Sequence, residues 1–372
     1  MATMPTPATP QRSAPRLACV ATIATRAVRA LAAAVALGAI VLGCSHSPTG
    51  PGPPPRALPR FYNDEPAWSP DGTSLLFLHY PETPEENLNG GFQIWRYDFA
   101  SGLRQFLCAG YEPKWAGNDA FTFTVYPEYQ IYRYSFATGM AAPIVACDGF
   151  SQWGSTAPDG HVLAFGSNCS SNNDAILHLK LLDLMTHEVH TIPGQDSVAW
   201  CEPAWSPDGH QLAHTRFNPV TGFHLFVMDT SGVNAVALGS DGTDDYGPAW
   251  SHAGDWIYVV RVGSSQSIRN GLWRIHPDGS QPEFVMPDVY TFTISPLDTA
   301  LVIAKVDSAT NSLDLWASTP TGTEQRRLFM PKQSPTLRAQ QRAGFAPPTS
   351  STRLEVAHEV RPNVEPRLEP DY

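Results

Sequence analysis

Carboxylate side chains recur at one position relative to a repeated phrase in this 372-residue sequence. They stand one to four residues before Pro-Ala-Trp or Pro-Lys-Trp. The acidic residues at these positions are Asp64, Glu65, Glu112, Glu202, Asp244 and Asp245. Carboxylates gathered at a surface of low dielectric focus the electric field and attract a cation or a basic peptide. They are equally compatible with solvated loop residues that keep one face soluble. A recognition site therefore requires a fold that brings these residues together.

Metal and nucleophile chemistry have less support in the residue pattern. The run Asp241-Gly-Thr-Asp244-Asp245 offers oxygen ligands but lacks a calcium-loop template, so no metal site is predicted. His187, His190, His210 and His214 fall in predicted turns and strands as packed or solvated residues, and no His-Glu-x-x-His motif occurs. A Gly-x-Ser-x-Gly nucleophile elbow is also missing. We assign no catalytic residue and no cofactor.

Six cysteines bear on the cellular compartment. Apart from Cys19 and Cys44 near the N-terminus, the cysteines are Cys108, Cys147, Cys169 and Cys201. An even number in an exported domain is typical of disulfide bonds. The preferred pairing is Cys108–Cys147 with Cys169–Cys201, Cys147–Cys169 is a second possibility, and buried free thiols are a third.

The first 43 residues have the parts of a lipoprotein export signal. Arg26 and Arg29 precede an uncharged apolar stretch that ends in Val-Leu-Gly-Cys44. A basic region, a short apolar segment and a small residue before the cleavage point are typical of a secretory signal, and about 20 apolar residues would be needed for a spanning helix. The final four residues resemble a bacterial lipobox, which implies that Cys44 is acylated and holds the mature chain on a bilayer. An ordinary signal peptide or an uncleaved anchor is the alternative.

The segments on either side of the central region are poor in core-forming residues. Residues 44–60 contain six Pro and two Gly and are predicted to form an extended stalk after the lipidated Cys44, and residues 331–372, with seven Pro, are predicted to be disordered. The net charge of −11 excludes a general nucleic-acid binder, because little basic charge is available to neutralise phosphates.

The central region is a sixfold repeat. The phrase Pro-Ala-Trp-Ser-Pro-Asp-Gly at residues 66–72 recurs at 203–209 and, with changes, at four further places. Its turns begin at Pro70, Gly117, Pro158, Pro207, His252 and Pro296, which are 47, 41, 49, 45 and 44 residues apart. Within a unit, aromatic and β-branched residues alternate with polar ones, as in strands. Four antiparallel strands in each unit predict an all-β, six-bladed β-propeller over residues 61–330.

The repeated phrase resembles the WD40-like PD40 repeat of the TolB-type six-bladed propeller family. The resemblance covers residues 61–330, but the α/β domain that precedes the propeller in TolB has no counterpart in the 44–60 stalk. The same repeat occurs in propellers of prolyl-oligopeptidase-type peptidases, whose hydrolase domain would need the missing Gly-x-Ser-x-Gly elbow. Some PD40-type propellers are pectin-degrading lyases that use histidines and a metal.

The resemblance and the acidic positions together predict a function. In a propeller the residues before each Pro-Ala-Trp phrase lie on the face where the innermost strands begin, near the central channel. We expect a monomeric, non-catalytic envelope lipoprotein, periplasmic or surface-exposed and anchored to the outer membrane. Its acidic rim would bind a protein or peptide. A carbohydrate-active enzyme, either a polysaccharide lyase or a hydrolase, is the alternative, and a structural spacer is a third possibility.

Overall fold

A computed structural model describes the repeat region. The described residues are 60–61, 63–81, 91–145, 147, 149–169, 176–195, 198–218, 220–239, 242–263, 268–307 and 311–329. They belong to the first of two compact units, Met1–Phe329 and Met330–Tyr372. The predicted export signal, the predicted lipidation site Cys44, most of the predicted stalk and the C-terminal tail lie outside the described residues.

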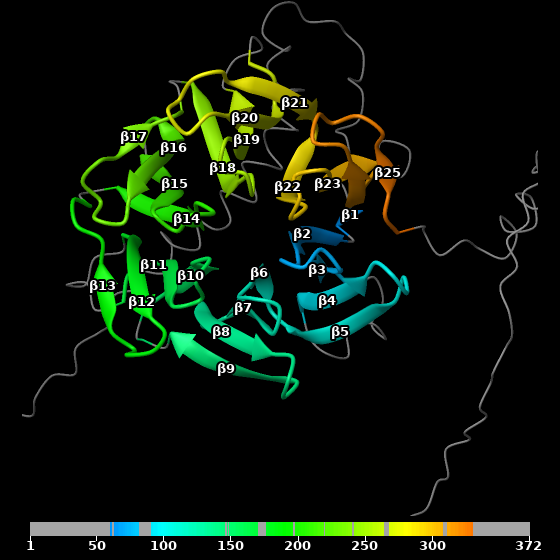
Figure 1. Ribbon diagram of the computed structural model, residues 1–372, viewed down its shortest axis with the longest axis horizontal. Coiled ribbons are helices and arrows are strands. Elements are labelled where there is room, and N and C mark those ends of the chain that lie inside the picture. Colours follow the sequence, from blue (N-terminus) through cyan, green and yellow to red (C-terminus); the bar gives the residue numbers. More distant parts are fainter. Residues whose placement is uncertain are drawn as a thin grey trace, which may run out of the picture. The chain divides into compact units, whose positions relative to one another are not determined.

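Six antiparallel sheets follow one another around a ring (Figure 1). The first two blades are β2 (Asn63–Trp68), β3 (Ser74–His79), β4 (Gln93–Asp98) and β5 (Arg104–Ala109), then β6 (Tyr111–Trp115), β7 (Ala120–Val125), β8 (Gln130–Ser135) and β9 (Met140–Val145). The third and fourth are β10 (Ser151–Thr156), β11 (Val162–Ser167), β12 (His178–Asp183) and β13 (Val189–Thr191), then β14 (Ala199–Trp205), β15 (Gln211–Asn218), β16 (Gly222–Asp229) and β17 (Val236–Ala237). The fifth is β18 (Thr243–Trp250), β19 (Ile257–Gly263), β20 (Gly271–Ile275) and β21 (Glu283–Pro287). The sixth is β22 (Val289–Ile294), β23 (Leu301–Asp307), β24 (Ser312–Ser318) and β25 (Arg326–Arg327), with β1 (Arg60–Phe61) added.

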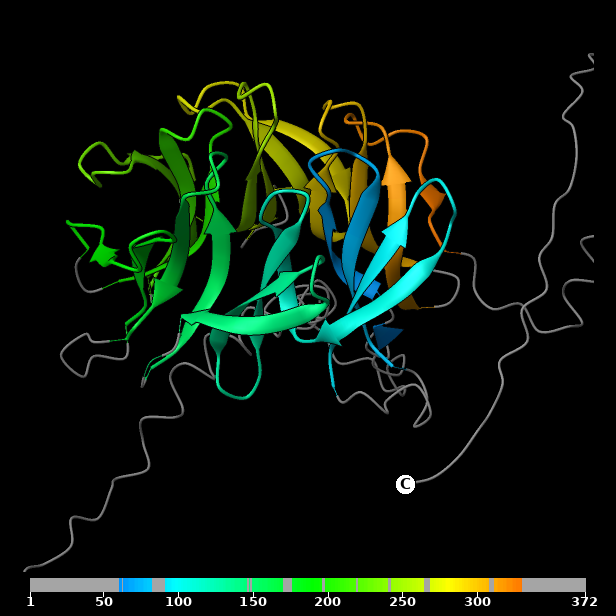
Figure 2. The same ribbon diagram turned by 60° about the horizontal axis from the view of Figure 1, so that its bottom comes forward.

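The predicted all-β, six-bladed propeller with four antiparallel strands per blade is therefore confirmed. Figure 2 shows the blades from the side, with the β2–β3 hairpin at one end of the ring and β1 at the other. We call the end at which the innermost strands β2, β6, β10, β14, β18 and β22 begin the rim face. No helix in the described part of the chain is long and apolar enough to cross a membrane.

The second strand of the first blade is apolar on both sides and packs against both neighbouring blades. In β3, Leu76 packs against Phe121 and Phe123 of the second blade, whereas Leu75 and Phe77 pack with residues of the sixth blade. Successive side chains of a strand point to opposite faces, so a continuous apolar run fills both interfaces. Each fully buried side chain of this kind contributes about 1.5–3 kcal/mol.

The tryptophan of the repeated phrase joins neighbouring blades through its indole N–H. Trp115 donates a 2.8 Å hydrogen bond to the backbone oxygen of Ala67 in the preceding blade, and Trp205 donates one of 2.9 Å to Ser155. Trp250 repeats the bond, to Ala204 at 3.1 Å. These tryptophans therefore serve blade packing.

The ring closes at the sixth blade, where both ends of the propeller meet β24. Strand β1 pairs with β24 in parallel and β25 pairs with it antiparallel, so no long edge of this blade is left open. Asp314 on β24 accepts hydrogen bonds from Asn63 of the first blade at 2.7 Å and from two guanidinium nitrogens of Arg327 at 2.9 and 2.7 Å. One buried carboxylate thus connects the first blade to the last strand.

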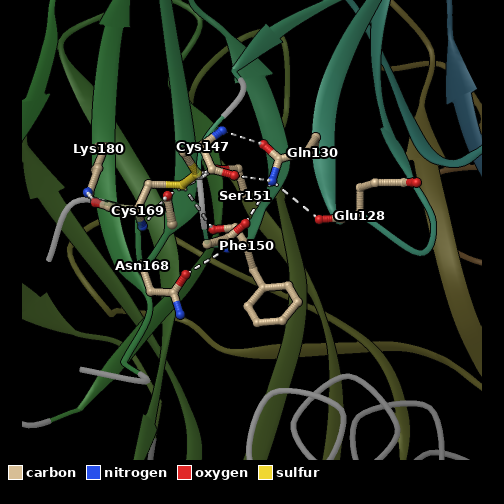
Figure 3. The surroundings of a disulfide bond; sticks show 10 residues. Glu128, Gln130, Cys147, Phe150, Ser151, Asn168, Cys169 and Lys180 are labelled. Carbon is tan, nitrogen blue, oxygen red and sulfur yellow. Dashed lines mark hydrogen bonds between the residues drawn. A yellow bond between two sulfur atoms is a disulfide. The ribbon is translucent and has the colours of Figure 1, made fainter. Parts of the chain in front are cut away.

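One disulfide links two connections of the third blade (Figure 3). Cys147, ahead of β10, is bonded to Cys169, after β11, with their Cα atoms 5.8 Å apart. The preferred pairing of Cys108 with Cys147 and of Cys169 with Cys201 is wrong, because Cys108 and Cys201 are free thiols. The pairing observed is the second one considered from the sequence.

The register of the third blade explains this pairing. Ser151 at the start of β10 lies opposite Ser167 at the end of β11, so residues just outside this pair are brought together. Gln130 of the second blade holds the same connection, since its side-chain amide donates to the backbone oxygens of Cys147 and Gly149 at 3.2 and 2.7 Å (Figure 3).

Candidate binding site at the propeller axis

A β-bulge interrupts the innermost strand of each of the first five blades. Strand register shifts at the same point of the repeated phrase, between Asp64 and Ala67 in the first blade, for example. The bulge residues have positive φ: Glu65 (47°), Glu112 (58°), Trp153 (60°), Glu202 (54°) and Gly247 (56°). For a residue other than glycine this conformation costs about 1–3 kcal/mol and persists only where surrounding contacts fix it. The acid before Pro-Ala-Trp is therefore a built feature of the blade.

The carboxylates at the bulges fix the bulge of the next blade. The side chain of Glu65 accepts a hydrogen bond from the backbone N–H of Glu112 at 2.6 Å. Glu112 in turn accepts one from the backbone N–H of Trp153 at 3.2 Å. Glu202 accepts one from Gly247 at 2.9 Å. Each of these three glutamates thus satisfies a backbone donor that the bulge removes from the strand ladder.

Hydroxyl groups complete this arrangement. Thr124 donates to Glu112 at 2.9 Å, and Thr215 donates to Glu202 at 3.1 Å. Where the sixth blade meets the first, Thr291 takes the place of a glutamate: its hydroxyl oxygen accepts the Glu65 N–H at 3.1 Å and donates to Asp64. The Asp64 carboxylate also accepts the Glu65 N–H, at 2.8 Å.

Three of the predicted acids, Glu65, Glu112 and Glu202, form a group that we call the axial carboxylates. They lie on the innermost strands of blades one, two and four and are half-buried. The charge of Glu202 acts on Glu112 although their blades are not neighbours in the ring, and both residues lie on innermost strands.

The axial carboxylates hold protons more tightly than free glutamates do. Burial, and then the charges of Asp64 and Glu112, raise the pKa of Glu65 to about 8. Burial and the charge of Glu202 raise the pKa of Glu112 to about 7, against the hydrogen bonds from Thr124 and Trp153 that lower it. Burial also raises the pKa values of Glu202 and Asp64. Like charges and partial dehydration both disfavour the ionised forms.

Lys114 is the cation of this group, and sequence analysis missed it. It lies two residues after Glu112, it is exposed, and its charge lowers the pKa values of all three axial carboxylates. Its position in the repeated phrase is occupied by Ala67 and Ala204 in the first and fourth blades. The replacement of Ala by Lys in Pro-Lys-Trp was the signal that could have found it.

The two aspartates of the fifth blade behave differently from the glutamates. Asp245 is 0% exposed and forms a bidentate ion pair with Arg261, at 2.6 and 3.0 Å. The prediction that it belongs to a partner-binding rim is wrong, because its oxygens are enclosed within the blade. Asp244 is half-buried and accepts the backbone N–H of Phe223 at 2.7 Å. Burial raises the pKa of Asp244.

The four histidines considered from the sequence differ from the axial carboxylates in their surroundings. His187, His190 and His210 are exposed. His214 is fully buried, accepts a hydrogen bond from Arg216 at 3.1 Å and has its pKa lowered to about 3 by burial and by that arginine. Within the described residues, no group of three or more His, Cys, Asp or Glu side chains could hold a metal ion.

The fold and site define a six-bladed all-β propeller with carboxylates from three blades at its axis. The fold is similar to that of TolB from Acinetobacter baumannii, with a TM-score of 0.56 and 16% identity over 68% of this chain and 63% of that chain. It is also similar to an oligogalacturonate lyase from Vibrio parahaemolyticus, with a TM-score of 0.52 and 16% identity over 74% of this chain and 79% of that chain. At this level of identity the likeness shows the fold.

Sequence comparison matches a smaller part of the chain than structure comparison does. No family model matches the chain. A stretch of 87 residues is 33% identical to the "Uncharacterized protein Atu1656" of Agrobacterium fabrum (strain C58 / ATCC 33970), which covers 23% of this chain and 28% of that protein. The chain thus spans about a quarter of that relative and 63% of the TolB structure. The TolB-like propeller fold is shown, and the PD40 repeat and lipoprotein assignments stay predictions.

Proposed function

We propose that this protein is a non-catalytic lipoprotein of the bacterial cell envelope whose propeller binds a protein or peptide partner through its rim face. The observation that carries the proposal is that Glu65, Glu112 and Glu202 all stand at bulges of innermost strands, where each accepts a backbone N–H of the next blade. They come from three separate blades, and electrostatic interactions link Glu112 to both of the others. A rigid ring that holds variable loops around such a group is suited to recognition.

The electrostatics of the axial carboxylates favour a basic partner. Their raised pKa values mean that Glu65 and Glu112 hold part of their protons near neutral pH, because ionised neighbours repel one another. A positive group brought into this place by a partner would offset the repulsion and displace the protons. Binding of a basic segment is therefore coupled to proton release, and its affinity should rise with pH between about 6 and 8.

The membrane part of the proposal depends on Cys44, outside the described residues. We propose that its thiol is acylated and that residues 45–60 tether the propeller to the outer membrane. The test is growth of the producing bacterium with a labelled fatty acid, followed by fractionation of wild type and Cys44→Ser. Label and membrane association should both disappear in the variant. Equal labelling of the two proteins would contradict the proposal.

The binding part is tested with the axial carboxylates neutralised. The acylated full chain is used to capture partners from envelope extract. The same capture is done with a variant that carries Glu65→Gln, Glu112→Gln and Glu202→Gln together, which we call the axial variant. The control changes three exposed acids in hairpin turns of the opposite face, Asp159→Asn, Glu188→Gln and Glu324→Gln. Both variants exchange three carboxyl groups for amides, so a loss of captured proteins only in the axial variant supports the proposal. Equal capture by all three proteins would contradict it.

The absence of catalysis is tested separately. The purified chain is incubated with oligogalacturonate, the substrate named for one similar structure, and unsaturated products are followed by ultraviolet absorbance. We expect no product above the rate without protein. Product formation that disappears in the axial variant would replace the binding proposal with the carbohydrate-active alternative.

A further inference from the structure

Six aromatic side chains form a continuous arc across the first three blades. The rings of Tyr80, Phe92, Tyr111, Tyr129 and Phe150 contact one another in this order, and Tyr126 contacts Tyr129 as a side branch; we call these six rings the aromatic arc. Neighbouring ring centroids are 5.3 to 6.2 Å apart and the interplanar angles are 61° to 86°. This is the edge-to-face geometry that aromatic pairs prefer, and it makes the arc one stiff surface.

Every ring of the arc lies on the rim face. Tyr80 follows the end of β3, and Phe92 directly precedes β4. Tyr111 begins β6, and Phe150 directly precedes β10. Tyr126 and Tyr129 lie in the turn between β7 and β8, at the same end of the second blade, because β7 runs antiparallel to β6. The arc therefore crosses three blades at the end where the innermost strands begin.

The arc lies beside the axial carboxylates. The charges of Asp64 and Glu65 act on the Tyr80 phenol, and that of Glu112 acts on both Tyr111 and Tyr129. Burial and these charges raise the pKa values of the three tyrosines, which keeps their phenols neutral. A cation placed over the arc would therefore meet aromatic ring faces and carboxylates together.

Two rings of the arc are open to a partner. The exposed fraction of Phe92 is 41% and that of Tyr126 is 61%, whereas the other four rings are half-buried. Elsewhere among the described residues, arginines and a lysine lie over aromatic rings, as Arg216 does over Trp200 at 3.8 Å. Phe92, Tyr111, Tyr126, Tyr129 and Phe150 take part in none of the cation–π contacts found in the described part of the chain. Their faces lack the cation that aromatic faces elsewhere in this protein have.

We infer that the aromatic arc docks an extended segment of a partner protein and that an arginine of this segment lies over the arc and against the axial carboxylates. The inference rests on the proposed function and specifies its ligand. Arginine fits better than lysine, because its planar guanidinium both stacks on aromatic rings and pairs with carboxylates through a fork of N–H groups. Apolar residues beside the arginine would cover Phe92 and Tyr126. The backbone N–H and C=O groups of an extended partner segment would stay exposed to solvent.

The first test asks which residue type the surface selects. A phage-displayed library of random twelve-residue peptides is selected on the immobilised full chain. We expect the selected peptides to be enriched in arginine next to apolar or aromatic residues. A selected pool without arginine enrichment, or no selection above an uncoated support, overturns the inference.

The second test separates the arc from the carboxylates. The tightest selected peptide, and the same peptide with the neutral arginine analogue citrulline, are measured by fluorescence anisotropy against wild type, Phe92→Leu, Tyr126→Leu and Glu112→Gln. The control is Met140→Ala, whose side chain is exposed at the start of β9, at the other end of the second blade. Thermal midpoints and circular dichroism confirm that each variant is folded.

We expect a loss of about twofold to fivefold for each arc variant, since exposed cation–π contacts are worth about 0.5–1 kcal/mol, and of about tenfold or more for citrulline and for Glu112→Gln, with Met140→Ala unchanged. Weakening by Glu112→Gln alone overturns the role of the arc and leaves the proposed function standing. Weakening by the arc variants but not by citrulline overturns the arginine. If no variant weakens binding, both the inference and the proposed site fail.

Discussion

The side chain of Glu65 in the first blade accepts a hydrogen bond from the backbone N–H of Glu112 in the second blade, at 2.6 Å. Glu112 repeats the contact with Trp153 in the third blade. The residues that give the rim face its acidity thus also hold neighbouring blades together. A ligand that draws these carboxylates away from the bulges would act on the blade contacts as well.

The first prediction concerns the pH dependence of stability. The pKa values of Glu65 and Glu112 are raised in the folded state, to about 8 and about 7 from 4.5. The folded state then binds more protons than the unfolded state over this range, so the contribution to stability is present at low pH and is lost as pH rises through the folded pKa. The free energy of unfolding, measured with urea, should fall between pH 6.5 and 8.5.

A control isolates this effect from other titrations. His214 has its pKa lowered to about 3, so titration of its unfolded form makes stability rise with pH up to about pH 7.5, opposite in sign to the expected fall, and its contribution is constant above that. Glu65→Gln with Glu112→Gln should flatten the fall, because an amide keeps an acceptor for the bulge N–H without a titrating proton. The same slope in wild type and variant would contradict the assignment.

The second prediction concerns the buried ion pair of the fifth blade. Replacing Asp245 by Asn leaves Arg261, whose side chain is 7% exposed, without its counter-charge. Loss of one partner of a buried pair costs about 3–5 kcal/mol, and guanidinium unfolding measures it. The control is Glu283→Gln, which breaks the more exposed pair with Arg274 and should cost less than about 1 kcal/mol. Similar costs for the two variants would contradict the prediction.

The third prediction concerns the tryptophans between blades. Trp205→Phe keeps an aromatic ring but removes the indole N–H that reaches the backbone oxygen of Ser155 in the third blade. We expect the variant to lose about 1–2 kcal/mol, because a partly buried carbonyl loses its donor. Trp68→Phe is the matched control, since the Trp68 indole donates only within its own turn, to Gly72 at 3.2 Å. A larger loss for Trp68→Phe in thermal unfolding would argue against a special role between blades.

The fourth prediction concerns the disulfide. Non-reducing peptide mapping should recover Cys147 linked to Cys169, with Cys108 and Cys201 alkylated as free thiols. Replacement of both bonded cysteines by serine should cost about 3 kcal/mol, because the bond closes a loop over a separation of 22 residues. Cys108→Ser changes a free thiol and should cost much less. Recovery of a Cys108–Cys147 peptide would contradict the structure.

Much of the fold could be predicted because its signals are local. Alternation of apolar residues, the Ser-Pro-Asp-Gly turn and the repeat of both every 41 to 49 residues act within one blade, and six such units predict the ring. Part of the candidate site was predictable for the same reason. A glutamate directly before Pro-Ala-Trp always falls on the bulge, so Glu65 and Glu202 share one environment.

The position of Asp245 could not be predicted by the same local reasoning. It precedes Gly247 by two residues, and the bulge turns the strand at Gly247, so Asp245 lies opposite Arg261 within the blade and does not reach the axis. Whether an acid stands at the bulge or inside the blade depends on which residue of the strand has the positive φ angle. The residue type alone does not show this. Aligning Asp245 with Asn63 of the first blade, rather than with Glu65, would have separated the two.

The amino-acid order alone thus determined the strands, the number of blades and the acids that stand at the bulges, because each depends on neighbours within about 45 residues. Only the tertiary structure decided that Glu112 and Glu202 act on each other across the axis, that Cys147 bonds Cys169, and that six aromatic rings from three blades form one arc. These contacts join residues of different strands and blades, and closing the ring sets their distances. Spacing along the chain does not encode them.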